Sequence, residues 1–181
     1  MHMPERQYWT AERVRALPDD GNRYECVYGE LLVSPSPREI HQRVLGRLHL
    51  AVARYLETDR TGVVYFSPAD ISWREDTLVQ PDLFVVPIEQ AREGWTAMRN
   101  LWLAIEVLSP STARHDRFTK RVLYQREGVA TYWIVDTKAE LVEVWSPSDE
   151  QPEIVRDVLT WRPSSARTPL VLELKALFAP L

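Results

Sequence analysis

Two acidic side chains stand at positions where an ionised carboxylate is costly. Glu106 lies inside the apolar run LAIEVL, and Asp82 follows Pro81 and opens the run DLFVVP. Two carboxylates that approach each other raise each other's pKa unless a cation lies between them. A divalent metal ion would remove this conflict, and ligation by oxygen alone favours magnesium, with manganese as the alternative. The residues alone leave another interpretation open, in which Asp82 caps a turn and Glu106 pairs with an arginine.

Lys120 is a candidate partner for Glu106. From Glu106 to Ser111 an extended chain advances about 16 Å at about 3.3 Å per residue. A helix that returns from Thr112 to Lys120 descends about 12 Å at about 1.5 Å per residue. Because helical side chains lean toward the N-terminus, Lys120 is expected to reach the level of Glu106, where it could hold a water molecule or a phosphate.

The same helix also allows a simpler interpretation of Lys120. Asp116 stands four residues earlier, which is the spacing of an ordinary surface ion pair. Phe118 lies roughly opposite Lys120, whereas Leu123 and Tyr124 share its side. The sequence therefore does not decide which side of this helix meets the protein interior.

The elements that must position these residues follow from the periodicity of apolar side chains. A helix is predicted from about residue 38 to 57, and a second from a cap at Ser111 or Thr112 to about Glu127, ended by Gly128. A strand that is apolar on both faces, such as 101–109, is usually central and covered on both sides. Strands are predicted at residues 24–27, 31–33, 63–68, 70–73, 82–87, 101–109, 131–137 and 141–147, with weaker ones at 154–159 and 170–174. The first two flank Tyr28 and Gly29, which are predicted to form a hairpin turn. This order predicts an α/β (α+β) fold, a mixed sheet with helices on its faces.

Length and composition narrow the class of protein. The chain has 181 residues, which predicts a single domain, with residues 1–23 as a peripheral N-terminal segment. Its one cysteine, Cys26, cannot form an intramolecular disulfide or a paired-cysteine metal site. No apolar window is long enough for a membrane span, and the N-terminus has no apolar targeting region, so a cytoplasmic location without membrane contact is expected.

The charge pattern bears on nucleic-acid binding. A net charge of −4 argues against a protein that coats nucleic acid, but it leaves a local basic groove open. Arginines on the two predicted helices could follow a phosphate backbone or could simply keep the surface soluble. They are Arg43, Arg47, Arg54, Arg114, Arg117 and Arg121.

Three segments together resemble a known family. They are RYECVYGELLVSPSPREIHQRV, VQPDLFVV and AIEVLSPSTARHDRFTKRVLYQREGVATYWIVDT. This combination resembles the Uma-two-type family of bacterial proteins described as endonucleases, within the restriction-endonuclease-like PD-(D/E)xK superfamily. The likeness runs from about residue 24 to 177 and is most specific over residues 81–136. It implies a restriction-endonuclease-like mixed sheet flanked by helices, in which two acids hold magnesium and a lysine assists attack of water on a phosphodiester.

The resemblance assigns roles to the acids and the lysine. Asp82 matches the aspartate of the proline-aspartate motif, and Glu106 matches the second acid. The common pattern has lysine two residues after that acid, where this chain has Leu108. The resemblance implies that the lysine has moved to the next helix, as Lys120. It also implies that a backbone carbonyl near Val107 completes the metal site.

Two further residues match the family near the first long helix. Glu30, in YGEL, matches an acid that precedes the helix, and His41 matches a histidine near the helix start. From the residues alone, Glu30 could equally be a solvated hairpin residue. His41 borders an apolar stripe and could equally be a partly buried histidine with a hydrogen bond.

The sequence therefore predicts a magnesium-dependent endonuclease that hydrolyses nucleic-acid phosphodiesters, with DNA preferred over RNA as substrate. A catalytically inactive nuclease fold that binds nucleic acid or a protein is the alternative, and the absence of lysine at position 108 favours it slightly. In the protein-binding version, exposed aromatics would contact the partner. The seven tryptophans, Trp95, Trp145 and Trp161 among them, make this possible, although most of them should simply belong to the core. A homodimer is a further expectation, because enzymes that cut both strands often pair two copies.

Overall fold

A six-stranded mixed sheet forms the centre of the protein. The computed structural model describes residues 7–94, 97–163 and 168–180. The strand order is β10-β9-β8-β7-β6-β3, with β7 and β8 parallel and every other pair antiparallel. The strands are β3 Gly62–Phe66, β6 Leu83–Pro87, β7 Leu103–Val107, β8 Tyr132–Asp136, β9 Leu141–Trp145 and β10 Glu153–Val155. The predicted mixed sheet is confirmed.

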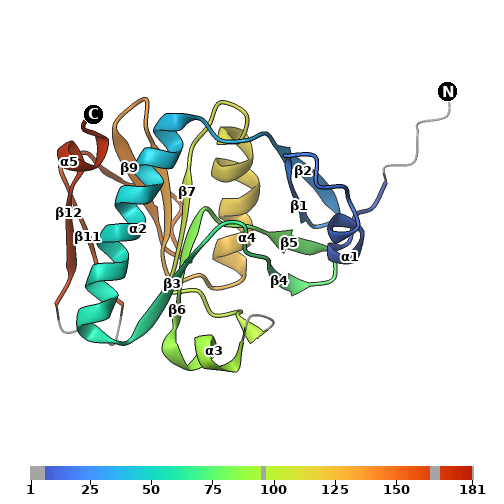
Figure 1. The fold of residues 1–181 in the computed structure, drawn as a ribbon, viewed down its shortest axis with the longest axis horizontal. Coiled ribbons are helices and arrows are strands. Elements are labelled where there is room, and N and C mark those ends of the chain that lie inside the picture. Colours follow the sequence, from blue (N-terminus) through green and yellow to red (C-terminus); the bar gives the residue numbers. More distant parts are fainter. Residues whose placement is uncertain (1–6, 95–96, 164–167, 181) are drawn as a thin grey trace.

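Helices cover both faces of this sheet. Helix α2 (Glu39–Asp59) lies on one face, and the π-helix η2 (His115–Lys120), which continues into α4 (Arg121–Arg126), lies on the other (Figure 1). The α2 stripe of Val44, Leu48 and Val52 recurs every fourth residue and is fully buried, as its periodicity predicts. Among the described residues, no helix is long and apolar enough to cross a membrane.

The alternation of side chains along the central strands decides which face each residue meets. In β7, Leu103 and Ile105 belong to the core beneath α2, whereas Ala104 belongs to the core beneath α4. Glu106 is two residues beyond Ala104 and therefore points toward η2 and α4. The strand is buried along its whole length, as its continuous apolar run predicts.

The helix of residues 113–126 ends as predicted but begins differently. The Ser109 hydroxyl accepts a hydrogen bond from the backbone N–H of Thr112, so Ser109 caps the first turn in place of Ser111 or Thr112. At the other end, Gly128 has a φ of 72°, a left-handed conformation that glycine adopts without strain.

A second sheet lies beside the main one and carries the N-terminal hairpin (Figure 1). Its order is β2-β1-β5-β4, and the predicted turn at Tyr28 and Gly29 joins β1 to β2. Ala11 and Val14 of helix α1 (Ala11–Arg15) pack there against Cys26 and Leu78, so part of the N-terminal segment contributes to a small core. The strands are β1 Arg23–Val27, β2 Glu30–Ser34, β4 Ile71–Arg74 and β5 Thr77–Val79.

The C-terminal region differs from the prediction. The segment 154–159 is divided between β10 and β11 (Val158–Trp161), which belong to different sheets, because the chain turns at Arg156 and Asp157. Strand β11 pairs with β12 (Leu170–Glu173), and the chain then enters the short helix α5 (Leu174–Phe178). Helix α3 (Ile88–Glu93) follows β6 directly and, like α1, β5 and α5, was not predicted.

Candidate active site

Charged side chains gather in the interior where β1, β6, β7 and η2 meet. Glu25, Asp82, Glu106, Asp116 and Lys120 each have 2% or less of their surface exposed. Arg23, whose side chain is partly buried, adjoins them. Four carboxylates thus face two permanent cations, so the cluster has an excess of negative charge when all of its acids are ionised.

Lys120 occupies the middle of this cluster. Its Nζ donates to Glu106 Oε1 at 2.8 Å and also lies 2.9 Å from Glu25 Oε2 and 3.6 Å from Asp116 Oδ1. The expectation that Lys120 reaches the level of Glu106 is confirmed. The surface ion pair between Lys120 and Asp116 is wrong as an interpretation, because both side chains are buried.

The helix formed by η2 and α4 turns the side that carries Lys120, rather than the side that carries Phe118, toward the interior. Phe118 is 64% exposed, whereas Leu123 and Tyr124 are fully buried. Lys120 shares the buried side, and its three carboxylate contacts compensate the ammonium there. The positive charge of Lys120 is stabilised in turn: burial lowers its pKa, but Glu106, Glu25 and Asp116 outweigh burial and raise it.

Glu106 has one satisfied and one unsatisfied oxygen. Oε1 accepts hydrogen bonds from Lys120 and, at 3.1 Å, from the Tyr124 hydroxyl. Oε2 is buried and has no hydrogen-bond partner among the described residues. Burial raises the pKa of Glu106, Lys120 lowers it, and the neighbouring carboxylates raise it further, so the pKa lies well above its usual range.

Asp82 has the opposite electrostatic setting. Its Oδ1 accepts from Arg23 Nη1 at 2.6 Å, and its Oδ2 accepts from His41 Nε2 at 3.0 Å and from the Val107 backbone N–H at 2.8 Å. Burial raises the pKa of Asp82, but the His41 hydrogen bond and the Arg23 charge outweigh it and hold the pKa well below its usual range. The arginine interpretation therefore had the right residue type but the wrong acid, since arginine pairs with Asp82 and lysine pairs with Glu106.

Sequence reasoning missed Glu25 and Arg23 as members of the cluster. Glu25 Oε1 accepts a 2.7 Å hydrogen bond from the backbone N–H of Gln80, next to β5. Positions 23, 25 and 27 alternate along β1 and share one face, and Val27 is buried on it. Because Tyr24 and Cys26 form the apolar alternation of this strand, the pattern alone would have turned Arg23 and Glu25 outward.

Three further residues were predicted for the site: His41 and Val107 contact Asp82, whereas Glu30 does not reach the cluster. His41 is buried near the start of α2 and contacts Asp82, whereas Val107 reaches Asp82 through its backbone N–H. Glu30 is exposed at the start of β2, where it pairs with Val27 beside the turn. The structure brings together Asp82, His41, Glu106 and Lys120, and it leaves Glu30 outside the cluster.

Most of the helix arginines proposed to follow a phosphate backbone have structural partners. Arg47 donates to the carbonyls of Leu177 and Ala179, and Arg117 forms ion pairs with Asp136 and Glu143. The other two engaged arginines are Arg43, which pairs with Glu39, and Arg121, which lies over the ring of Trp145. Trp145 and Trp161 are buried, in line with the expectation that most tryptophans belong to the core, so neither offers an exposed ring to a partner. Trp95 lies outside the described residues.

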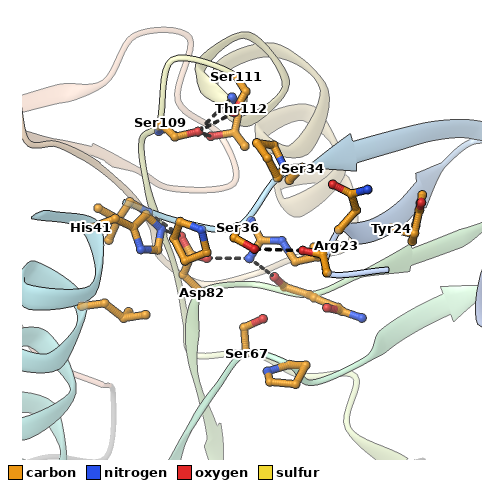
Figure 2. A pocket seen from close by; sticks show the side chains of 18 of the residues that line it. Arg23, Tyr24, Ser34, Ser36, His41, Ser67, Asp82, Ser109, Ser111 and Thr112 are labelled. Atoms are coloured by element: carbon orange, nitrogen blue, oxygen red, sulfur yellow. Dashed lines mark hydrogen bonds and ion pairs between the residues drawn. The ribbon is translucent and has the colours of Figure 1, made fainter. Parts of the chain in front are cut away.

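A pocket of about 870 Å³ opens onto the Asp82 side of the cluster. Figure 2 shows Asp82 between His41 and Arg23, with hydroxyl side chains of neighbouring loops around them. The hydroxyl residues that line it include Ser34, Ser36, Ser67, Ser109, Ser111 and Thr112. Glu25, Glu106 and Lys120 do not line the pocket and lie deeper in the protein.

Asp82 at this pocket and the acids buried beneath it have donors that fit a hard divalent cation. Within the described part of the chain, no three side chains of histidine, cysteine, aspartate or glutamate are arranged to hold a metal by themselves. Magnesium, however, is commonly bound by one or two carboxylates and completes its shell with water. The excess of buried carboxylates and the unpartnered Oε2 of Glu106 meet that need. Because both oxygens of Asp82 are engaged, binding through Asp82 would replace one of its present contacts.

Comparison with known proteins identifies the family. The chain is similar over 94% of its length, with a TM-score of 0.78 and 22% identity, to 97% of a chain from Anabaena variabilis described as "a putative nuclease belonging to DUF820". This likeness shows a shared fold. Comparison with curated proteins gives no match. A family model described as "Putative restriction endonuclease" matches residues 11–175, and the chain therefore belongs to the Uma2 family.

Proposed function

We propose that this protein is a nuclease that requires a divalent metal, magnesium or manganese, and hydrolyses phosphodiester bonds of nucleic acid, with DNA preferred. Membership of the Uma2 family supports a nuclease. The observation that carries the metal-dependent version is the placement of two acids side by side: Asp82 directly precedes β6, and Glu106 lies in the adjacent strand β7. Lys120 contacts Glu106 from the following helix. This arrangement supports a site built from two acids and a lysine although position 108 is leucine.

Asp82 and Glu106 would hold the metal, with the carbonyl of Val107 as a further oxygen donor. When bound, such an ion lowers the pKa of a coordinated water molecule and stabilises negative charge on the phosphate. Glu25, which shares Lys120 with Glu106, supplies a further acid that the sequence did not indicate. Glu30 is not included, because its exposed side chain lies outside the cluster.

The other side chains orient and compensate these acids. Lys120 holds Glu106 through Oε1 and leaves Oε2 available. His41 donates from Nε2 to Asp82 Oδ2 and fixes the orientation of that carboxylate. Arg23 lines the pocket and touches Asp82, so its guanidinium is placed to neutralise a phosphate that enters. A positioned charge of this kind contributes to rate through electrostatic stabilisation of the transition state.

Nuclease activity is tested with the purified protein, magnesium or manganese, and labelled DNA and RNA. Asp82→Asn keeps the size of the side chain and removes its charge, so we expect it to abolish cleavage. Glu150 is an exposed acid outside the cluster, and Glu150→Gln provides the matched control that should cleave like the wild type. Cleavage by Asp82→Asn at the wild-type rate would end the proposal.

A binding module without turnover is the second candidate, and one observation favours it. Both oxygens of Asp82 are engaged by protein donors, one of them Arg23. A site whose acid is already compensated can persist without a metal. Calorimetry separates the two candidates: a magnesium affinity that Glu106→Gln removes, in a protein that cleaves no nucleic acid, would support binding alone.

A further inference from the structure

The proposed site is recessed rather than displayed on a surface. Asp82 is only 2% exposed and lines a pocket enclosed by several chain segments. These walls include residues 21–24, 34–38, 66–68 and 109–112. Prolines at positions 35, 37, 68 and 110 restrict the backbone of three of these segments. A phosphate must enter this enclosure to reach Asp82.

A double helix is poorly suited to such an enclosure. DNA duplexes are stiff over distances far longer than the pocket, and their phosphates are held against a stacked cylinder of base pairs. A single strand is narrower, bends freely and can leave its bases unstacked. The pocket volume of about 870 Å³ is within the range of sites that bury drug-sized ligands. It therefore has room for part of one strand.

Phe66 provides an aromatic surface at this pocket. It is the last residue of β3, lines the pocket and is 56% exposed, which is unusual for phenylalanine. The next residue, Ser67, donates its backbone N–H to the Asp82 carbonyl at 3.1 Å. The backbone of Phe66 therefore lies close to that of Asp82. The His49 ring packs edge-on against Phe66 with ring centroids 4.9 Å apart, so the Phe66 ring is supported on one side while much of the residue stays exposed.

Arg38 adds an uncommitted cation to the same pocket. It precedes α2, lines the pocket and is exposed, and its guanidinium makes no hydrogen bond or ion pair with any other described residue. Arg15 also lines the pocket but is paired with Asp70. Nucleic-acid sites without sequence preference combine such cations with aromatic side chains on which bases stack.

We infer that the pocket receives a single strand of nucleic acid, with a base stacked on Phe66 and a phosphate contacted by Arg38, rather than an intact double helix. This inference rests on the proposed function and specifies its substrate class. DNA and RNA strands share the aromatic bases and the phosphates that the two residues would recognise.

Binding to labelled oligonucleotides tests the inference. Fluorescence anisotropy is measured in magnesium on the Asp82→Asn background, with gel analysis to verify that the strand stays intact. We expect Phe66→Ala to weaken binding of a single strand about tenfold or more, the range of base–aromatic stacking. Phe118→Ala removes another exposed phenylalanine outside the pocket and should leave binding unchanged. DNA and RNA strands of the same sequence, measured in the same assay, show which of the two nucleic acids binds more tightly.

A blunt duplex of the same sequence and the salt dependence complete the test. The duplex should bind more weakly than the strand and should not respond to Phe66→Ala. Arg38→Ala should reduce the slope of log affinity against log salt by about 0.7, the value for one phosphate contact on a single strand. Tighter binding of the duplex, or equal affinities of Phe66→Ala and Phe118→Ala for the strand, would overturn the inference. The proposed function is judged separately, by whether wild type cleaves and Asp82→Asn does not.

Discussion

Lys120 Nζ lies 2.8 Å from Glu106 Oε1 and joins the π-helix η2 to the central strand β7. The same ammonium contacts Glu25 of β1 and Asp116 of its own helix. One cation therefore serves carboxylates from three elements. This sharing makes Lys120 the electrostatic centre of the buried cluster. Burial first, and the neighbouring carboxylates after it, keep the pKa of Glu106 raised although an ammonium touches it.

Replacement of Lys120 should destabilise the fold strongly. Lys120→Met keeps an unbranched side chain but leaves three buried carboxylates without their shared cation, and loss of a partner from a buried ion pair typically costs about 3–5 kcal/mol. Lys138→Met removes an exposed lysine and should change the free energy of unfolding by less than about 0.5 kcal/mol. Urea unfolding at pH 7 measures both values. Equal stabilities for the two variants would mean that Lys120 does not compensate the cluster.

Asp82 should stabilise the protein only while it is ionised. Its folded-state pKa is depressed, so its contribution is present above the pKa of the unfolded chain and is lost as pH falls through the folded-state pKa. Asp82→Asn should lower the free energy of unfolding by about 3 kcal/mol at pH 7, because it leaves Arg23 without its carboxylate. The difference from wild type should narrow below about pH 4. A constant difference across this range would contradict the assigned ionisation.

Ionisation of Glu106 should lower the free energy of unfolding, whereas ionisation of Asp82 raises it. Its folded-state pKa is raised, so the folded protein loses stability as pH rises above the unfolded-state pKa toward the folded-state value. Glu106→Gln keeps an oxygen acceptor for Lys120 and Tyr124 and removes the unfavourable charge. In EDTA at pH 8 we expect this variant to be more stable than wild type by about 1 kcal/mol, the size of a common single-site effect. Chemical denaturation at pH 5 and pH 8 checks this, and a variant less stable at pH 8 would disprove the assignment.

Metal binding should depend on pH through the same carboxylate. A proton held by Glu106 must leave before its oxygens can bind a cation, so affinity should rise with pH. Manganese at about 100 times its dissociation constant should stabilise the fold by about 2.7 kcal/mol. The resulting increase in Tm should be larger at pH 8 than at pH 5.5 and absent in Glu106→Gln, with Glu150→Gln as the unaffected control. An increase that survives in Glu106→Gln would place the metal elsewhere.

The predictable part of the site is local in the chain. Glu106 and Lys120 are joined by one strand end, a short loop and one helix, and the rise per residue of each element fixes their relative level. The hairpin at Tyr28 and Gly29 and the stripe of α2 are equally local patterns, and both are confirmed. The family resemblance adds which acids belong together, since no periodicity links Asp82 to Glu106.

The missed parts depend on contacts between distant segments. Glu25 belongs to the site because β1 pairs with β5. This pairing places Glu25 next to Gln80, whose backbone N–H donates to it, and next to the charged cluster. The burial of Lys120 rather than Phe118 depends on compensation by Glu25 and Glu106, which hydrophobic periodicity cannot register. Glu30 fits the family pattern, but its position beside the turn, at the end of the hairpin, leaves it exposed although Leu32 on the same face of β2 is buried. For Glu25 and Lys120 the charge partners, rather than the apolar pattern, decide the outcome.

The central claim is that Asp82 and Glu106 together hold a divalent cation. Diffraction from crystals soaked in manganese, recorded near the manganese absorption edge, tests it most directly. We predict an anomalous peak within bonding distance of oxygens of both carboxylates, at about 2.1 Å as for related oxygen-ligated ions, accompanied by loss of a present contact of Asp82. A map with no peak at saturating manganese, and with the Arg23 contact to Asp82 and the Lys120 contact to Glu106 both intact, would contradict it.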